Sequence, residues 1–588
     1  MALRAAGSGT GRRERPRRVG TAKLVTIAVA IAALCMITLT TKAVISHASC
    51  TNSPVLVNVV TSDDIAPAIQ TVARAFNNQN ATAAGRCVEV QVDQASSAAE
   101  AAQVDGQASQ QGAAVDAWIP DSSLWVDVAR SYPVGAQTVQ PTGKSVARSP
   151  LMLVTTKEVA AATGIFDYPA SWSVLLPSAY GGPPTSLGIS VDLPDPTDSA
   201  SGLASLIEVS RQLGTGATAR TAVTDFALGV NDTEDFDSPG ALAQFVQTTQ
   251  YPFNRKAVTV ATEQAVIAYD KANAKTPLAA EYASSPNKAL GTPELDYPYV
   301  LTTSKTAELQ GATDFGNYLQ TDYARAVIRS YGFRSTDGVP DFMPTAAGLS
   351  AQPLQLASNV SATEAAANLQ VWQRLGLGFR DLVLTDVSPA MNQPSGLDNL
   401  TIEQLLEQTS LRGLGLFPDG TQMGLWQLGK SNSLSQPYTQ LVPIGPLSAN
   451  FGLLTRRAQI QQIDETTTTA SGTQALNDAI LDAYKMMTAT YAPSYSNAVI
   501  VLTSGVDSAP GDMSLSSLLS QLQKLYNPSR KVAIVAIMFG QQGNYTALQE
   551  IADATGGAAF RVSDPTQIGQ IFIEAVSQRM CNQGCVAP

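Results

Sequence analysis

The chain has 588 residues, which is enough for two or three domains with well-filled cores. Hydrophobic residues make up 44% of it and charged residues 14%, a composition typical of a folded, mildly polar, exported protein and not of a disordered one. The net charge is −11, yet residues 1–23 carry seven basic residues and one acid, or +6. The rest therefore carries −17, the total less this +6, which argues against nucleic-acid binding by the folded part.

An apolar segment follows these basic residues directly. Residues 24–40 read LVTIAVAIAALCMITLT, and the next charge is Lys42. The segment is at the lower limit for spanning a bilayer and exceeds the usual hydrophobic core of a signal peptide. We therefore expect a transmembrane helix or signal anchor over 24–45, a cytoplasmic segment over 1–23, and all later residues outside the cell membrane. A signal peptide cleaved after Ala48 is the alternative.

Four of the five cysteines lie beyond the apolar segment, where an oxidising environment favours disulfide bonds. We expect Cys50–Cys87 to join the first two main strands and Cys581–Cys585 to close a loop in the C-terminal tail, 581–588. A zinc site is the alternative. It would lack imidazole ligands, because His47 is the only histidine, and the two cysteine pairs stand at opposite ends of the chain.

Residues 50–345 alternate between strand and helix patterns. A β-branched run starts at Val55, a helical period follows through Ile65, Ile69 and Phe76, and CVEVQVDQ then alternates strictly. Later strands are expected at 113–121, 149–156, 185–196 and 295–303, and helices at 199–213, 263–273 and 313–333. A stretch rich in proline, alanine and serine then predicts a linker over 346–376.

A second alternating unit covers residues 377–580. Three buried strands are predicted at 379–386, 497–505 and 531–540, with helices at 401–411, 473–487, 514–525, 544–557 and 564–578. Buried strands that alternate with helices indicate an α/β, doubly wound (Rossmann-like) parallel sheet, which binds ligands beyond the carboxyl ends of its strands. The sequences DVSPAM and TSG, which follow two of these strands, fall at that edge.

This second unit resembles the von Willebrand factor A domain. The resemblance rests on the Asp-x-Ser run after the first strand, on GTQMGLW as the second strand, and on ADATGGAAFRVSDPTQIGQIF near the end. It implies a divalent metal, Mg²⁺ or Ca²⁺, held by five side chains, with one position left for an acidic side chain of a protein partner. The matching residues here are Asp386, Ser388, Ala390, Thr473 and Ser504.

Two of these five positions depart from the family pattern. Alanine at 390 cannot bind a metal, and Ser504 replaces the second carboxylate, although Asp507 would compensate if its loop folded back. We therefore expect a degenerate, metal-free site, with binding of Mg²⁺ or Ca²⁺ as the alternative. Without a metal, Asp386 accepts from the amides of the next turn and Ser388 caps a helix.

Residues 53–345 resemble bacterial extracellular solute-binding proteins, which clamp a ligand between two lobes. The resemblance rests on VTSDDIAPAIQTVARAFN, VDAWIPDSSLW, VARSPLMLVTT, LPDPTDSASGLASL and LDYPYVL, in this order. Such a domain behind a membrane anchor and ahead of an A domain is similar to a family of actinobacterial surface proteins. The expected architecture is thus a two-lobed periplasmic-binding-protein-like domain followed by a von Willebrand factor A domain.

The resemblance to oxyanion-binding members of this fold implies which residues line the cleft. They are Ser62, Ser122, Ser199 and Tyr297, with Asp63 and Trp125 beside them. Asp63 and Asp64 at the first helix and Asp121 before Ser122 would repel an oxyanion, so we expect a small neutral or cationic solute. In the alternative interpretation Asp63 and Ser199 are helix caps and Trp118 and Trp125 belong to the core. The acidic run 232–237, DTEDFD, predicts a solvated loop.

The residue inventory argues against an enzyme. A single histidine beside the apolar segment excludes serine–histidine and cysteine–histidine catalysis, and neither a P-loop nor a Gly-rich dinucleotide turn is present. We expect a membrane-anchored, extracytoplasmic binding or adhesion protein, with a solute for the first domain and a protein partner for the second. A non-catalytic structural or assembly factor of the cell envelope, with vestigial sites, is the alternative.

Overall fold

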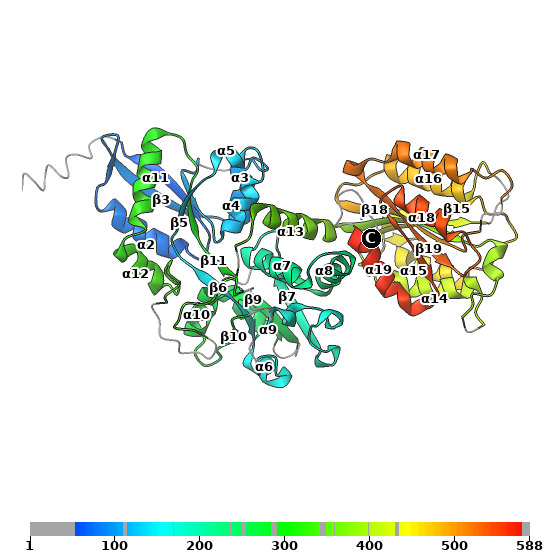
Figure 1. Cartoon of the computed structure of the whole chain (residues 1–588), viewed down its shortest axis with the longest axis horizontal. Coiled ribbons are helices and arrows are strands. Elements are labelled where there is room, and N and C mark those ends of the chain that lie inside the picture. Colours follow the sequence, from blue (N-terminus) through cyan, green and yellow to red (C-terminus); the bar gives the residue numbers. More distant parts are fainter. Residues whose placement is uncertain are drawn as a thin grey trace, which may run out of the picture.

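A computed structural model shows two α/β domains, with helix α13 running from the first toward the second (Figure 1). The structure describes residues 53–109, 114–167, 170–233, 237–249, 255–283, 291–340, 349–357, 359–397, 399–429, 434–506 and 509–578. Within these ranges, every helix is too short or too polar to cross a bilayer. The predicted anchor over 24–45 lies outside the described residues. Cys87 is disulfide-bonded, but the other cysteines also lie outside, so the two pairings stay predictions.

The first lobe is built on a sheet in the order β2-β3-β1-β4-β12-β5. Its strands are β1 (Val55–Thr61), β2 (Thr82–Ala83), β3 (Arg86–Gln94), β4 (Ala117–Ile119), β5 (Gln140–Ser145) and β12 (Pro298–Leu301). The central strands β1, β3 and β4 are parallel, so β1 and β4 end at the same edge. The helices of this lobe are α2 (Ala66–Asn77), α3 (Ser97–Val104), α4 (Ser123–Arg130), α5 (Gly135–Thr138), α11 (Thr306–Tyr318) and α12 (Asp322–Ser330).

The prediction of one helix over 313–333 was wrong, because the chain forms α11 and α12 there. The Thr321 hydroxyl accepts a hydrogen bond from the Ala324 amide and so starts a second helix. A helical hydrophobic period continues through such a break, and only the capping residue marks it.

The second lobe contains a sheet in the order β10-β6-β9-β7-β8, with β11 paired to β6. Its strands are β6 (Ser149–Thr155), β7 (Ile189–Pro194), β8 (Asn231–Thr233), β9 (Lys256–Thr262), β10 (Ala279–Glu281) and β11 (Glu294–Leu295). Its helices are α6 (Lys157–Thr163), α7 (Ala200–Leu213), α8 (Ala217–Gly229), α9 (Pro239–Thr249) and α10 (Glu263–Ala272). Two neighbouring segments cross between the lobes, since the Val146 amide donates to the Tyr297 carbonyl (2.9 Å) and the Leu151 amide donates to the Pro293 carbonyl (2.9 Å).

Part of the predicted linker is a packed helix, α13 (Ala362–Leu375). It contacts α4 and α7 of the first domain and buries Leu369 and Trp372. The Trp372 indole donates to the Asp195 carboxylate (3.0 Å), and Glu364 forms a salt bridge with Arg211 (2.7 Å). The apolar residues of α13 recur at helical spacing, and this contact outweighs the loop-like composition of the residues before it.

The main sheet of the second domain has the order β15-β14-β13-β18-β19-β20 and is parallel except for the edge strand β15. A small antiparallel pair, β16 (Asn450–Phe451) and β17 (Leu454–Thr455), stands apart from it. The strands of the main sheet are β13 (Gly378–Asp386), β14 (Gln422–Leu428), β15 (Tyr438–Pro446), β18 (Tyr495–Thr503), β19 (Val532–Phe539) and β20 (Ala558–Val562). The helices are α14 (Ile402–Leu414), α15 (Arg456–Thr466), α16 (Leu476–Ala489), α17 (Leu515–Leu525), α18 (Tyr545–Asp553) and α19 (Ile568–Ser577). The three predicted buried strands are confirmed as β13, β18 and β19.

Candidate functional site

Asp64 lies where β1 ends and α2 begins. One of its carboxylate oxygens accepts from the Ser62 hydroxyl (2.7 Å) and the Ile65 amide (2.8 Å). The other accepts from the Tyr297 hydroxyl. Tyr297 is fully buried between the two crossing segments, so this carboxylate faces the junction of the lobes.

Asp121 follows β4 and directly precedes α4. Its amide donates to the Ser97 hydroxyl (3.1 Å), and its carbonyl accepts from the Tyr297 amide (3.1 Å). Only 8% of Asp121 is exposed, and its Oδ1 has no hydrogen-bond partner among the described residues. A buried carboxylate oxygen without a donor is costly, so this atom is a candidate contact for a ligand that carries a donor.

Asp237 brings a third buried carboxylate from the second lobe. One oxygen accepts from the Thr262 amide (2.7 Å), and the other accepts from the Ser201 hydroxyl. Thr262 caps α10 and Ser201 lies in the first turn of α7. The solvated loop predicted over 232–237 was therefore wrong for Asp237, which the fold buries between two helix starts. Sequence gave no signal for this, because the acidic run has no apolar period.

The three carboxylates influence each other. The pKa of Asp64 is raised to about 6, mainly by burial; the Tyr297 and Ser62 hydrogen bonds oppose this shift, and the charge of Asp237 adds to it. Burial holds the pKa of Asp121 well above its usual range, and the charges of Asp64 and Asp237 add to this effect. Carboxylates from both lobes thus form one acidic cluster, which we define as Asp64, Asp121 and Asp237.

The predicted cleft residues take different places around this cluster. Ser62 donates to Asp64, whereas the hydroxyls of Ser122 and Ser199 cap α4 and α7 by accepting from Leu124 (3.2 Å) and Gly202 (3.2 Å). Asp63 is exposed, and its neighbour Asp64 holds the position in the cluster. Trp118 and Trp125 are core residues, with 0% and 2% exposed. The capping role of Ser199 is confirmed, but α2 has no side-chain cap from Asp63.

In the second domain, the Asp386 carboxylate is already satisfied by protein donors. The Ser388 amide donates to its Oδ1 (2.8 Å). Its Oδ2 accepts from the Thr503 hydroxyl (3.0 Å), the Ser504 amide (3.1 Å) and the Ser504 hydroxyl (3.1 Å). Asp386 therefore accepts from the amides of neighbouring turns, as expected for a metal-free site, while Ser388 makes no side-chain cap.

These residues do not fit the divalent metal that the fold suggests. The one carboxylate at the sheet edge accepts four hydrogen bonds, Ala390 has no ligand atom, and Ser504 uses its hydroxyl as a donor to Asp386. Thr473 is half-buried in the loop before α16, and Asp507 lies outside the described residues. The buried Ser388 hydroxyl has no partner among the described residues and is the only feature that favours a bound ion. No group of three or more acidic, histidine or cysteine side chains within the described ranges has a metal-binding arrangement.

Two family models match the chain. Residues 57–334 match the bacterial extracellular solute-binding proteins, and residues 383–574 match the von Willebrand factor type A domain. The chain carries a solute-binding domain followed by a von Willebrand factor type A domain. The two predicted resemblances are thereby confirmed. Both families are binding domains, which are typically not catalytic. No curated protein matches the chain.

Solved structures of similar fold cover one domain or the other. The sulfate-binding protein SubI from Mycobacterium tuberculosis is 21% identical over 48% of this chain and 87% of its own, with a TM-score of 0.33. Iron-bound HitA from Pseudomonas aeruginosa is 13% identical over 55% of this chain and 100% of its own (TM-score 0.40). A von Willebrand factor type A protein from Catenulispora acidiphila is 18% identical over 35% of this chain and 43% of its own (TM-score 0.27).

Proposed function

We propose that the solute-binding domain captures a small cationic solute at the acidic cluster of Asp64, Asp121 and Asp237. The observation that carries this proposal is the buried Asp121 Oδ1, which has no donor among the described residues. An ammonium or guanidinium group supplies donors and positive charge together, and both are needed where the charges of Asp64 and Asp237 raise the pKa of Asp121.

The position of the cluster argues against an oxyanion as the solute. The amides at a helix start and the helix dipole attract negative charge, and this is how anions are bound at such places. Here Asp64 accepts from the Ile65 amide before α2, Asp237 accepts from the Thr262 amide before α10, and Asp121 directly precedes the cap of α4. A sulfate or phosphate would meet negative charge where it needs donors.

The second domain, in this proposal, contacts a protein without a metal. The hydrogen bonds on Asp386 support this, because an ion would have to displace the Thr503 and Ser504 hydroxyls. A hollow beside Ser504 opens at the same edge of the sheet and is lined partly by Pro389, Ala390 and Val506. Its walls also include the polar residues Gln393, Ser504 and Gln542, and such a mixed lining suits a protein side chain.

We further propose that the chain is anchored in the cell membrane by residues 24–45, with both domains on the outer side. The basic residues 1–23 before an uncharged apolar segment support this orientation. Solute capture outside the membrane and protein contact by the second domain would then occur on one surface protein.

The test uses the chain from residue 49 onward, which keeps every described residue, and measures its thermal unfolding with spermidine, choline, arginine, glucose and sulfate. A ligand that binds the native state raises the unfolding temperature. We expect at least one of the cations to raise it, and sulfate to leave it unchanged. Asp121→Asn should abolish this shift, whereas the control Asp314→Asn on α11, outside the cluster, should preserve it. The proposal would be contradicted if no cation raised the unfolding temperature, or if a cation raised it equally in the Asp121→Asn variant.

A further inference from the structure

The two faces of the second domain's sheet are covered unequally. On β18 and β19, the residues that face α16, α17 and α18 are at most 1% exposed: Val499, Val501, Ile534 and Ala536. Those at the alternate positions, on the side of α14 and α19, are only half-buried: Ala498, Ile500, Ala533 and Val535. The helices on this second face therefore leave the middle of the sheet uncovered.

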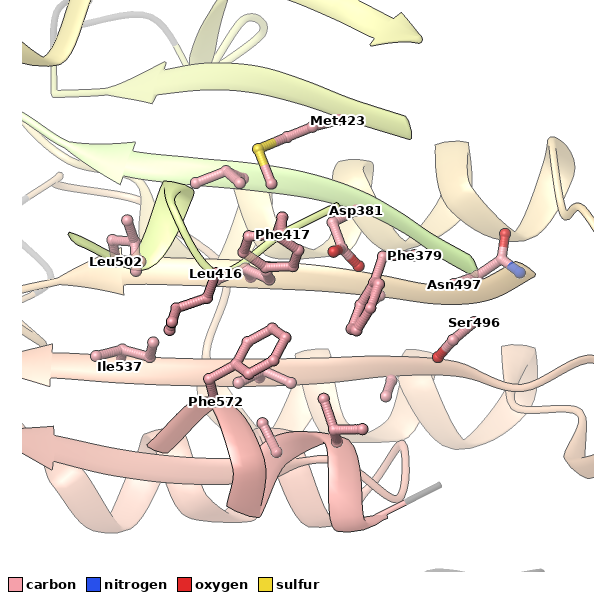
Figure 2. A pocket seen from close by; sticks show the side chains of 18 of the residues that line it. Phe379, Asp381, Leu416, Phe417, Met423, Ser496, Asn497, Leu502, Ile537 and Phe572 are labelled. Atoms are coloured by element: carbon pink, nitrogen blue, oxygen red, sulfur yellow. The ribbon is translucent and has the colours of Figure 1, made fainter. Parts of the chain in front are cut away.

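A cavity of about 290 Å³ fills this gap, near the lower end of the volumes typical of small-molecule sites. Figure 2 shows Phe379 at the start of β13, Phe417 after α14 and Phe572 on α19 around it. The centroids of these three rings are 5.1 to 5.4 Å apart. Leu502 and Ile537 extend the apolar wall toward the carboxyl ends of the strands.

Two cations line the opposite end of the cavity, where the strands begin. Lys531 directly precedes β19, and Arg374 is in the last turn of α13. Burial lowers the pKa of Lys531, and the charge of Arg374 lowers it further. No carboxylate among the described residues forms a salt bridge with Lys531. A half-buried ammonium beside a second cation is unfavourable unless an anion joins it.

Two carboxylates also line the cavity, on other elements than the two cations. Asp381 on β13 is level with Ala533 of β19, and β18 lies between them, so two strand spacings of about 4.8 Å each separate their backbones. Asp464 lies on α15 and accepts from the Ser410 hydroxyl (2.7 Å). The positive charge therefore lies on the β19 side of the cavity, two strands away from Asp381.

We propose that this cavity binds a single-chain amphiphile with an anionic head, its tail among the three phenylalanines and its carboxylate or phosphate at Lys531 and Arg374. An apolar cavity lowers stability roughly in proportion to its empty volume, so an aliphatic tail that fills it stabilises the domain. The head supplies the negative charge that the described residues do not place beside Lys531.

The test compares four amphiphiles with twelve-carbon chains and different heads: laurate, whose carboxylate carbon is one of the twelve, dodecyl phosphate, dodecanol and dodecyltrimethylammonium. Each is titrated below its micelle concentration into the delipidated chain from residue 49 onward, by calorimetry and by thermal unfolding. We expect the two anions to bind, dodecanol to bind about tenfold more weakly, as for the loss of one charge-assisted contact, and the cation to bind least. The ratio of laurate to dodecyl phosphate identifies whether a fatty acid or a lipid phosphate is the better head.

Variants assign binding to the cavity. Lys531→Gln should weaken laurate about tenfold, to the level of dodecanol, and leave dodecanol unchanged. The control Lys524→Gln removes a charge from an exposed lysine of the same domain and should change neither. Ala498→Leu fills the cavity with three carbon atoms, so it should abolish binding of both amphiphiles without lowering the unfolding temperature.

Three results would overturn the proposal. These are the absence of laurate and dodecyl phosphate binding, equal binding of all four heads, and unchanged laurate binding in a folded Ala498→Leu variant. Because these amphiphiles do not report on the acidic cluster, either proposal can fail while the other stands.

Discussion

The hydroxyl of Tyr297 donates to the Asp64 carboxylate, while the backbone amide of the same tyrosine donates to the carbonyl of Asp121 (3.1 Å). One residue between the lobes thus bonds to two of the three residues of the acidic cluster, to the side chain of Asp64 and to the backbone of Asp121. Tyr297 adopts a φ of 41°, in the left-handed region that a tyrosine rarely occupies. Such a conformation persists only where the surrounding structure determines it, and it is common near binding sites.

Replacement of this tyrosine tests the link directly. Tyr297→Phe removes the hydroxyl but keeps the ring that packs on Phe333 (5.2 Å between centroids). We expect a loss of about 1–2 kcal/mol in the free energy of unfolding of the first domain, since a buried carboxylate loses a donor. The hydrogen bond from Tyr297 lowers the Asp64 pKa, so its loss should raise this pKa. Cation binding at neutral pH should then weaken, because Asp64 carries less negative charge. Denaturant unfolding checks the first effect, with Tyr323→Phe, which is 51% exposed, as the control.

Titration of Asp64 should contribute to the pH dependence of the free energy of unfolding. Its pKa is raised from 3.8 to about 6 by burial, so the folded state binds a proton more tightly than the unfolded state does. The contribution of this group therefore favours folding at low pH and is lost as the pH rises from about 4 to about 6. Asp64→Asn should remove this loss. At pH 7 we expect the free energy of unfolding of the variant to exceed that of the unmodified chain by on the order of 1–3 kcal/mol. Parallel stability curves for the two proteins between pH 4 and pH 7 would contradict the prediction.

The metal site of the second domain should be recoverable by substitution. Mg²⁺ should leave the unfolding temperature of the natural chain unchanged, because Asp386 already accepts four hydrogen bonds. The double variant Ala390→Ser with Ser504→Asp adds a hydroxyl and a second carboxylate at the sheet edge. We expect Mg²⁺ to stabilise this variant and a chelator to reverse the effect. Stabilisation of the natural chain by Mg²⁺ would show that the site is functional as it stands.

A buried ion pair in the second lobe should be far more sensitive than an exposed one. Arg334 and Glu263 are each 1% exposed, lie 2.8 Å apart, and Arg334 also donates to the carbonyls of Gly338 and Ser350. Glu263→Gln leaves a buried guanidinium without its counter-charge, so we expect a loss of about 3 kcal/mol in the free energy of unfolding.

The matched control for this change is Asp419→Asn, which breaks the pair with Arg457 at the surface, where the aspartate side chain is 77% exposed. Its cost should be below about 1 kcal/mol. Denaturant unfolding of both variants gives the comparison, and similar losses would mean that burial does not set the strength of the Glu263 pair.

The sequence alone determined the order of the two domains and the main strands of the second. The strand run VAIVAIMF, which forms β19, is apolar throughout because helices lie on both faces of the sheet, so its pattern is visible without a structure. The predicted preference for a non-anionic solute also came from the sequence, because Asp64 and Asp121 stand at helix starts that can be read from their capping residues and periods.

Only the tertiary structure decided which side chains meet. Asp237 joins Asp64 and Asp121 because the two lobes bring distant segments together, and no local pattern records such a contact. The cavity beneath α19 is likewise invisible in the sequence, since Ala498 and Ile500 have the same strand pattern whether helices cover them or not. Local periodicity fixes the elements, whereas the spaces between elements depend on how their side chains pack.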